Sequence, residues 1–289
     1  MVEVDNIILS THHILYTQLV ARSLLNRMAN SVYQYPAWDK DSYGNPKTAE
    51  LADIRETCRT NLKYLAKEVL GMSKWDDNLH DNLAEYIEKS GKHKLILIPR
   101  GHLKSSIVTI AWSIQQLLRD PNKRILIRNA VWDQSRRFLG QIQGYLEDGQ
   151  LPMIFGRFKT QKTIWTKEEC DIHQKKVKKA SPSIMTAGLD TSLTGLHFDI
   201  VIDDDLVNDK NTSTKEQIQK VIEVYNDSFN LLDRGGQHIV VGTRWNNKDL
   251  YGHILTTDTK TVNLLELNKD GGADEWRSTY NRWVQSRKK

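Results

Sequence analysis

The stretch KLILIPRGHLKSS, residues 94–106, says most about the fold of this chain. Residues 94–98 form a short apolar run that is typical of a buried strand. Residues 99–103 predict a turn, and Lys104, Ser105 and Ser106 begin a helical pattern that continues to about Leu118. A strand that turns directly into a helix leaves backbone N–H groups free, and lysine and serine beside them suit phosphate and Mg²⁺. The stretch therefore predicts a phosphate-binding loop.

This loop departs from the common pattern G-x-x-x-x-G-K-[ST], because Leu103 stands where that pattern has its second glycine. The alternative is an ordinary strand-to-helix turn that binds nothing. The loop alone does not decide between the two readings.

A second feature lies about a hundred residues further on, where the apolar run FDIVI ends in Asp203, Asp204 and Asp205. Open α/β sheets bind ligands at the carboxyl ends of their strands, and three adjacent carboxylates repel one another unless a cation or solvent offsets them. In an ATPase one such acid helps to hold Mg²⁺ and the next orients the attacking water. The alternative is an exposed turn or helix cap.

A third feature is VVGTRWN, in which an apolar run ends at Gly242 and Thr243 and is followed by Arg244. A hydroxyl and a guanidinium at this strand end are suited to sensing a γ-phosphate, although a plain turn would have the same residues. The order and placement of the three features at three strand ends favour one common site.

The surrounding pattern predicts an α/β fold with a mostly parallel central sheet flanked by helices, preceded by an N-terminal helical region. Helices are expected over residues 11–30, 48–70, 75–89, 104–118, 133–147 and 214–232. Strands are expected over residues 94–98, 124–128, 183–188, 198–203, 238–243 and 262–267. Residues 151–181 predict irregular structure. The expected division is a helical region at 1–90, a P-loop ATPase core at 91–268 and a basic tail at 269–289.

The charge, cysteine content and hydropathy of the chain exclude some classes of protein. The chain has 289 residues and a formal charge of +5, of which residues 157–179 and residues 277–289 each contribute +5, so the rest sums to −5. Two basic segments on an acidic body suit a polyanionic partner, and solvated loops are the alternative. Cys58 and Cys170 stand alone, which predicts neither disulfides nor a zinc site. The mean hydropathy is −0.56, and neither a membrane span nor a secretory signal is expected.

Together these motifs resemble the ATPase domain of phage terminase large subunits, the motors that package DNA. The resemblance runs from about Asn61 to Leu255 and rests on LIPRGHLKSS, TAGLDTSLTGLHFDIVIDDDLVND and VVGTRWNNKDLYGHIL. It implies an additional-strand P-loop NTPase fold and Mg-ATP hydrolysis coupled to translocation of double-stranded DNA. It also implies a homo-oligomeric ring on the portal protein of a procapsid, a small terminase subunit as partner, and location in the host cytoplasm.

The resemblance also implies roles for individual residues. Lys104 contacts the phosphates, Ser105 and Asp204 hold Mg²⁺, and Asp205 positions the water. The strand register alone would instead use Asp203 and Asp204, so Asp203 is kept as a further metal ligand. Arg100 is a cis arginine and Thr243, with Arg244, couples hydrolysis to movement. The loop that binds the nucleotide comprises Arg100, Gly101, His102, Leu103, Lys104, Ser105 and Ser106.

Other roles stay open at this point. His80 or Asn82 are the candidates for contacting adenine. A trans-acting arginine from a neighbouring subunit is expected, with candidates Arg128, Arg136, Arg137 and Arg157. The residues after Leu267 leave no room for the nuclease domain that such proteins usually carry, so DNA cleavage is not expected and the nuclease would lie on a separate domain or chain. A helicase-like translocase and a non-hydrolysing nucleotide-binding assembly protein remain the alternatives.

Overall fold

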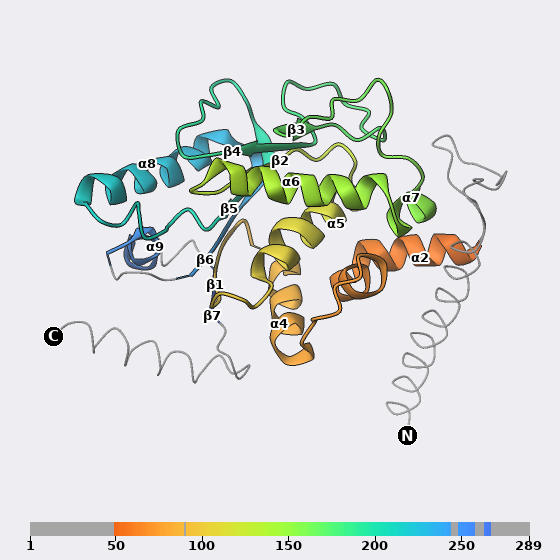
Figure 1. The fold of residues 1–289 in the computed structure, drawn as a ribbon, viewed down its shortest axis with the longest axis horizontal. Coiled ribbons are helices and arrows are strands. Elements are labelled where there is room, and N and C mark those ends of the chain that lie inside the picture. Colours follow the sequence, from red (N-terminus) through yellow and green to blue (C-terminus); the bar gives the residue numbers. More distant parts are fainter. Residues whose placement is uncertain (1–48, 90, 244–247, 258–262, 267–289) are drawn as a thin grey trace.

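The computed structural model describes residues 49–89, 91–243, 248–257 and 263–266. Its centre is a sheet in the order β3-β4-β2-β5-β6-β1-β7 (Figure 1). The strands from β4 to β7 in this order are parallel, whereas β3 pairs antiparallel with β4. The strands are β1 (His93–Leu97), β2 (Ile125–Arg128), β3 (Glu169–Cys170), β4 (Ile184–Ala187), β5 (Phe198–Asp204), β6 (Leu232–Gly242) and β7 (Asn263–Glu266).

Helices cover both faces of this sheet. One face packs against helices that precede β3, and the other packs against the last two helices, α8 and α9, which lie on the left in Figure 1. The helical elements are α2 (Ala49–Thr60), α3 (Leu62–Tyr64), η1 (Leu65–Val69), α4 (Asp77–Glu88), η2 (Ser106–Trp112), α5 (Ser113–Arg119), α6 (Trp132–Glu147), α7 (Gln150–Phe155), α8 (Lys215–Leu231) and α9 (Leu250–Thr257). Both faces of the sheet are buried, which explains why its strands are almost continuously apolar.

The strand order confirms the predicted fold class. β1 leads into the phosphate-loop candidate and β5 ends in the acidic residues, yet the two strands are not neighbours, because β6 lies between them and pairs in parallel with both. A parallel sheet with a strand inserted between the loop strand and the acid strand is the additional-strand P-loop NTPase arrangement. All three sequence features therefore meet at the carboxyl edge of the sheet.

The region before β1 is anchored to the sheet by a buried lysine. Lys94 is 2% exposed, and its ammonium donates hydrogen bonds to the carbonyls of Ile87 at 2.5 Å and Lys89 at 2.6 Å, at the end of α4. These carbonyls have no partner within the helix, so the lysine satisfies them. Burial lowers the pKa of Lys94 to about 8. The hydrophobic core is also continuous from α2 and α4 to the sheet.

Three expected elements differ in detail. The helix over residues 48–70 is interrupted at Asn61, whose side chain accepts a hydrogen bond from the backbone N–H of Tyr64 and so starts a new segment. β6 begins at Leu232 rather than at residue 238, and its pairing with β5 is irregular near Gly235, which has a φ of +86°. Residues 151–181, expected to be irregular, contain most of α7 and the short strand β3.

Several expectations concern residues outside the described part of the chain. These are the helix over residues 11–30, the basic tail and Arg244. The division into regions at residues 90 and 268 stays a prediction. Among the described residues, no helix is long and apolar enough to span a membrane.

Candidate functional site

The loop after β1 adopts a conformation usually reserved for glycine. Gly101 has a φ of +84° and Leu103, at the position where the common pattern has its second glycine, has a φ of +53°. A left-handed conformation costs an ordinary residue about 1–2 kcal/mol. The side chain of Leu103 packs against the main hydrophobic core, which compensates for this cost. The loop therefore turns as a phosphate loop does although a leucine replaces the glycine.

A buried histidine holds this loop against the preceding helix. The backbone N–H of Asp76 donates to Nδ1 of His80 at 2.8 Å, which leaves the proton on Nε2, and Nε2 then donates to the carbonyl of His102 at 3.2 Å. Burial lowers the pKa of His80. Both ring nitrogens contact backbone groups, so His80 supports the loop, and its contact with adenine stays a prediction. The other adenine candidate, Asn82, donates to the carbonyl of Asn78 on its own helix.

The serine of the loop meets the second acid of the β5 cluster. Ser105 Oγ donates to Asp204 Oδ1 at 3.0 Å, and Thr109 Oγ1 donates to Asp204 Oδ2 at 2.5 Å. Asp204 is fully buried, and burial, followed by the nearby charge of Asp205, raises its pKa to about 6. Its direct hydrogen-bond donors are neutral hydroxyls, so the carboxylate is a strong candidate to hold a cation. Sequence reasoning missed Thr109, which the helical spacing from Ser105 could have indicated.

The lysine of the loop meets the third acid. Lys104 Nζ lies 3.1 Å from Asp205 Oδ2, and the lysine side chain is 8% exposed. Asp205 has a φ of +50°, which turns the chain sharply at the end of β5. Its other oxygen, Oδ1, is buried and has no hydrogen-bond partner among the described residues. A buried polar atom without a partner marks a place where a ligand or a water completes the site.

Asp203 is placed differently from the expectation that it helps to hold the metal. Its two carboxylate oxygens accept hydrogen bonds from Arg128, at 2.7 Å to Nε and 2.8 Å to Nη2, and His238 Nε2 lies 2.7 Å from Oδ2. Burial alone would raise the pKa of Asp203, but Arg128 and His238 lower it. Successive side chains on a strand point to opposite faces, so Asp203 faces away from Ser105 and Asp204 faces towards it.

The end of β6 contacts the start of the loop. Thr243 Oγ1 donates to the carbonyl of Ile98 at 3.0 Å, and the backbone N–H of Ile98 donates to the carbonyl of Gly242 at 3.1 Å. A Cβ atom at Gly242 would lie 2.0 Å from the hydroxyl of Tyr251, so this position has room only for glycine. Tyr251 is fully buried and its pKa is raised, first by burial and then by Asp205 and other nearby carboxylates. Sequence reasoning missed this tyrosine.

The remaining candidates fall into two groups. Arg100 and Gly101 are exposed, and His102 and Ser106 are half-buried, along the loop and its following helix. Of the candidate trans-acting arginines, Arg128 is buried in its pair with Asp203 and is not available to a neighbour. Arg136 is paired with Asp133 and Glu168, whereas Arg137 and Arg157 are exposed.

The residues at this edge fit Mg²⁺ and a nucleotide phosphate chain. Among the described residues no group of three or more His, Cys, Asp or Glu side chains forms a metal cage. Mg²⁺ does not need one, because it commonly takes one or two protein oxygens and completes its shell with water and substrate phosphates. Ser105 Oγ and the buried carboxylate of Asp204 are such oxygens, and Lys104 is the adjacent cation for the phosphates.

Comparisons with known proteins add little to this geometry. No family model matches the chain, and no curated protein matches it. One similar solved structure is a Saccharomyces cerevisiae Dbp5 variant bound to Nup159, a Gle1 variant, IP6 and ADP, with 13% sequence identity and a TM-score of 0.42. The match covers 72% of this chain and 53% of that one, so this chain spans about half of the matched structure's length. A match this distant carries no argument about function.

Proposed function

We propose that this chain binds Mg-ATP at the carboxyl edge of its sheet and hydrolyses it. The observation that carries the proposal is the meeting of Ser105 with Asp204 and of Lys104 with Asp205, between loop and strand residues about a hundred positions apart in sequence. A hydroxyl, a lysine and two carboxylates at a strand-to-helix turn are the parts that phosphoryl transfer needs.

In the proposed mechanism, bound Mg²⁺ would neutralise charge on the β- and γ-phosphates. Lys104 exchanges its contact with Asp205 for a phosphate oxygen, because a triphosphate offers more negative charge than one carboxylate. That exchange frees Asp205 to orient the attacking water and to accept its proton. Thr243, at the end of β6, donates a hydrogen bond to the carbonyl of Ile98, at the end of β1. In this mechanism the bond transmits a change at the γ-phosphate to β1. Arg100, exposed in the loop, is the proposed cis arginine.

We further propose that hydrolysis drives viral DNA packaging. The support is the resemblance of the three motifs to phage terminase large subunits, together with the P-loop NTPase fold. In this proposal double-stranded DNA, the portal protein, the small terminase subunit and further copies of this chain are the partners, and cleavage lies elsewhere. The alternatives are a helicase-like translocase and an assembly protein that binds nucleotide without hydrolysing it.

Steady-state phosphate release with Mg-ATP tests the enzymatic proposal. We expect Lys104→Ala to abolish turnover, while the exposed Lys74→Ala serves as a matched control with wild-type activity. Because an arginine from a neighbouring copy contributes in the proposed ring, specific activity is expected to rise with protein concentration. Wild-type turnover by Lys104→Ala would refute the assignment of the loop, and nucleotide binding without turnover would support the assembly role.

A further inference from the structure

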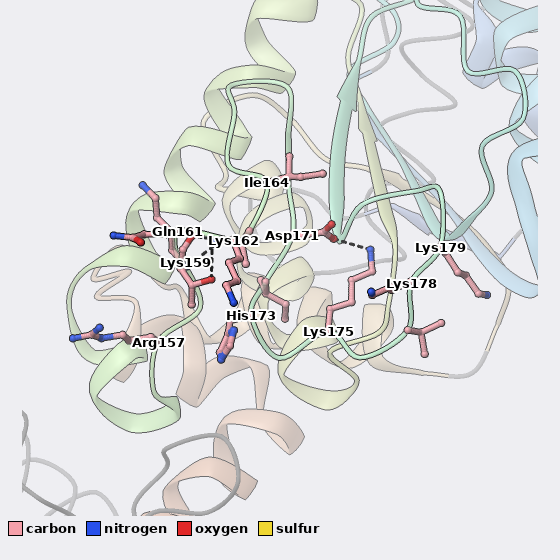
Figure 2. A pocket seen from close by; sticks show the side chains of 14 residues that line it. Arg157, Lys159, Gln161, Lys162, Ile164, Asp171, His173, Lys175, Lys178 and Lys179 are labelled. Carbon is pink, nitrogen blue, oxygen red and sulfur yellow. Dashed lines mark hydrogen bonds and ion pairs between the residues drawn. The ribbon is translucent and has the colours of Figure 1, made fainter.

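A basic hollow lies between two loops that follow α7 (Figure 2). It has a volume of about 810 Å³ and is formed by residues 157–164 and 171–179. Six of its lining residues are lysine or arginine and one is an acid: Arg157, Lys159, Lys162, Lys175, Lys178, Lys179 and Asp171. Figure 2 shows Lys162 and His173 near the centre of these side chains, with Arg157 on one side and Lys178 and Lys179 on the other.

The basic hollow sits at the amino edge of the sheet, opposite the candidate nucleotide site. Asn122, just before β2, accepts hydrogen bonds from the backbone N–H groups of Lys176 and Val177 at 2.9 and 3.0 Å. Lys179 pairs with Asp233 at the start of β6. The phosphate-loop candidate follows the carboxyl end of β1, and neighbouring strands are parallel. The basic hollow is therefore a separate surface from the site of the proposed hydrolysis.

The positive charge of the basic hollow is only partly compensated by ion pairs. Its one acid, Asp171, is held by Lys175 at 2.6 Å, and that lysine is only 7% exposed. Lys159 and Lys179 form exposed pairs with Glu147 and Asp233 outside the hollow, and such pairs contribute little and open readily. Lys162 and Lys178 form no ion pair within the described part of the chain. Clustered like charges raise the local potential and attract polyanions.

The loops that carry these charges are held in place by their own contacts. Thr163 Oγ1 donates to the carbonyl of Thr160 at 2.8 Å and closes the turn that presents Lys162. The backbone N–H of His173 donates to the carbonyl of Phe158 at 2.6 Å and joins the two loops. The cations are thus displayed on a hydrogen-bonded framework.

We infer that the basic hollow binds the phosphodiester backbone of duplex DNA, a choice of polyanion that rests on the proposed function. The one ring among the residues that line the hollow is the imidazole of His173, and no Phe, Tyr or Trp side chain lines it to stack successive unpaired bases. Lysine and arginine contacts to phosphates position a duplex independently of its sequence. DNA at this edge would leave the opposite edge open to nucleotide.

The test is binding of a fluorescent 30-base-pair duplex by the full chain without nucleotide, across a salt series. We compare Lys162→Gln/Lys178→Gln with the control pair Lys74→Gln/Lys215→Gln, which removes the same charge from exposed lysines outside the hollow. Each lost phosphate contact reduces the magnitude of the slope of log affinity against log salt by about 0.9. The double variant Lys162→Gln/Lys178→Gln is therefore expected to have a slope smaller by about 2 and an affinity roughly tenfold lower.

Equal affinities and slopes for the two pairs, with unchanged melting temperatures, would overturn the inference. Tighter binding of a single-stranded 30-mer than of the duplex through the same lysines would also overturn it. Since no ATP is present, a failure of the proposed hydrolysis leaves this result intact. Lys104→Ala, measured in parallel, tests hydrolysis by itself.

Discussion

Asp203 and Asp204 are neighbours at the end of one strand, and both are fully buried, yet their surroundings are opposite. Asp203 faces Arg128 and His238, and its pKa is lowered. Asp204 faces the hydroxyls of Ser105 and Thr109, and its pKa is raised to about 6. The first carboxylate has its counter-charge within the chain, whereas the second has none in direct contact.

This difference separates a structural acid from a functional one. A buried carboxylate with a bidentate arginine stabilises the arrangement of strands and needs no ligand. A buried carboxylate that contacts only hydroxyls is costly by itself and becomes favourable when a cation arrives. Asp203 thus lies on the face of the sheet that packs against α8. Asp204 lies on the opposite face, which meets the phosphate loop.

The largest expected effect comes from removing the structural carboxylate, that of Asp203. Asp203→Asn leaves the Arg128 guanidinium buried beside a neutral amide, and removing one partner of a buried pair costs about 3–5 kcal/mol. We expect the free energy of unfolding, measured with urea, to fall by that amount. Asp204→Asn is the matched control, since it removes a buried charge that has no cation in direct contact. An equal loss in both variants would contradict the comparison.

The next largest effect concerns the binding of Mg-ATP at Asp204. A ligand present at a hundred times its dissociation constant stabilises a protein by about 2.7 kcal/mol. We expect Mg-ATP to raise the melting temperature of wild type, and Asp204→Asn to lose the part of that rise that depends on Mg²⁺. Thermal unfolding with ATP, with and without Mg²⁺, measures this part. A Mg²⁺-dependent rise retained in full by Asp204→Asn would remove Asp204 from the metal site.

Thr109→Val sharpens the comparison with a smaller change. It keeps the shape of a fully buried side chain and deletes the donor to Asp204 Oδ2. A hydrogen bond to a charged group contributes about 1.5–3 kcal/mol, so the loss should raise the pKa of Asp204 further and weaken Mg²⁺ binding. Nucleotide binding as a function of Mg²⁺ concentration measures the effect. Thr109→Ser restores the donor and is the control.

The last prediction is a pH dependence of stability, which should have opposite signs for the two acids. The folded-state pKa of Asp204 lies above its ordinary value of 3.8, so its destabilising effect grows as pH rises towards about 6. Asp203 has a lowered pKa, so its contribution to stability is present above the ordinary value and is lost as pH falls below it. Unfolding free energies of wild type and Asp204→Asn between pH 4 and 6.5, without Mg²⁺, test this. A stability difference between them that does not change with pH would refute it.

The sequence predicted much of this fold because its strands are apolar runs buried on both faces. It also predicted that Lys104, Ser105 and the acids lie at one edge, since parallel strands end together. It could not separate Asp203 from Asp204, because their partners Arg128 and His238 are distant in sequence and come into contact only in the sheet. The support of the loop by His80 was equally hidden, since it depends on the tautomer that two backbone groups select.

The most direct test of the account is phosphate release from ATP as Mg²⁺ is titrated, for wild type and Asp204→Asn under the same conditions. The account predicts metal-dependent turnover in wild type and a loss of at least a hundredfold in the variant, about 2.7 kcal/mol in the barrier, with the fold retained. Turnover by Asp204→Asn at the wild-type rate and with the same Mg²⁺ dependence would contradict the assignment of Asp204 to the metal.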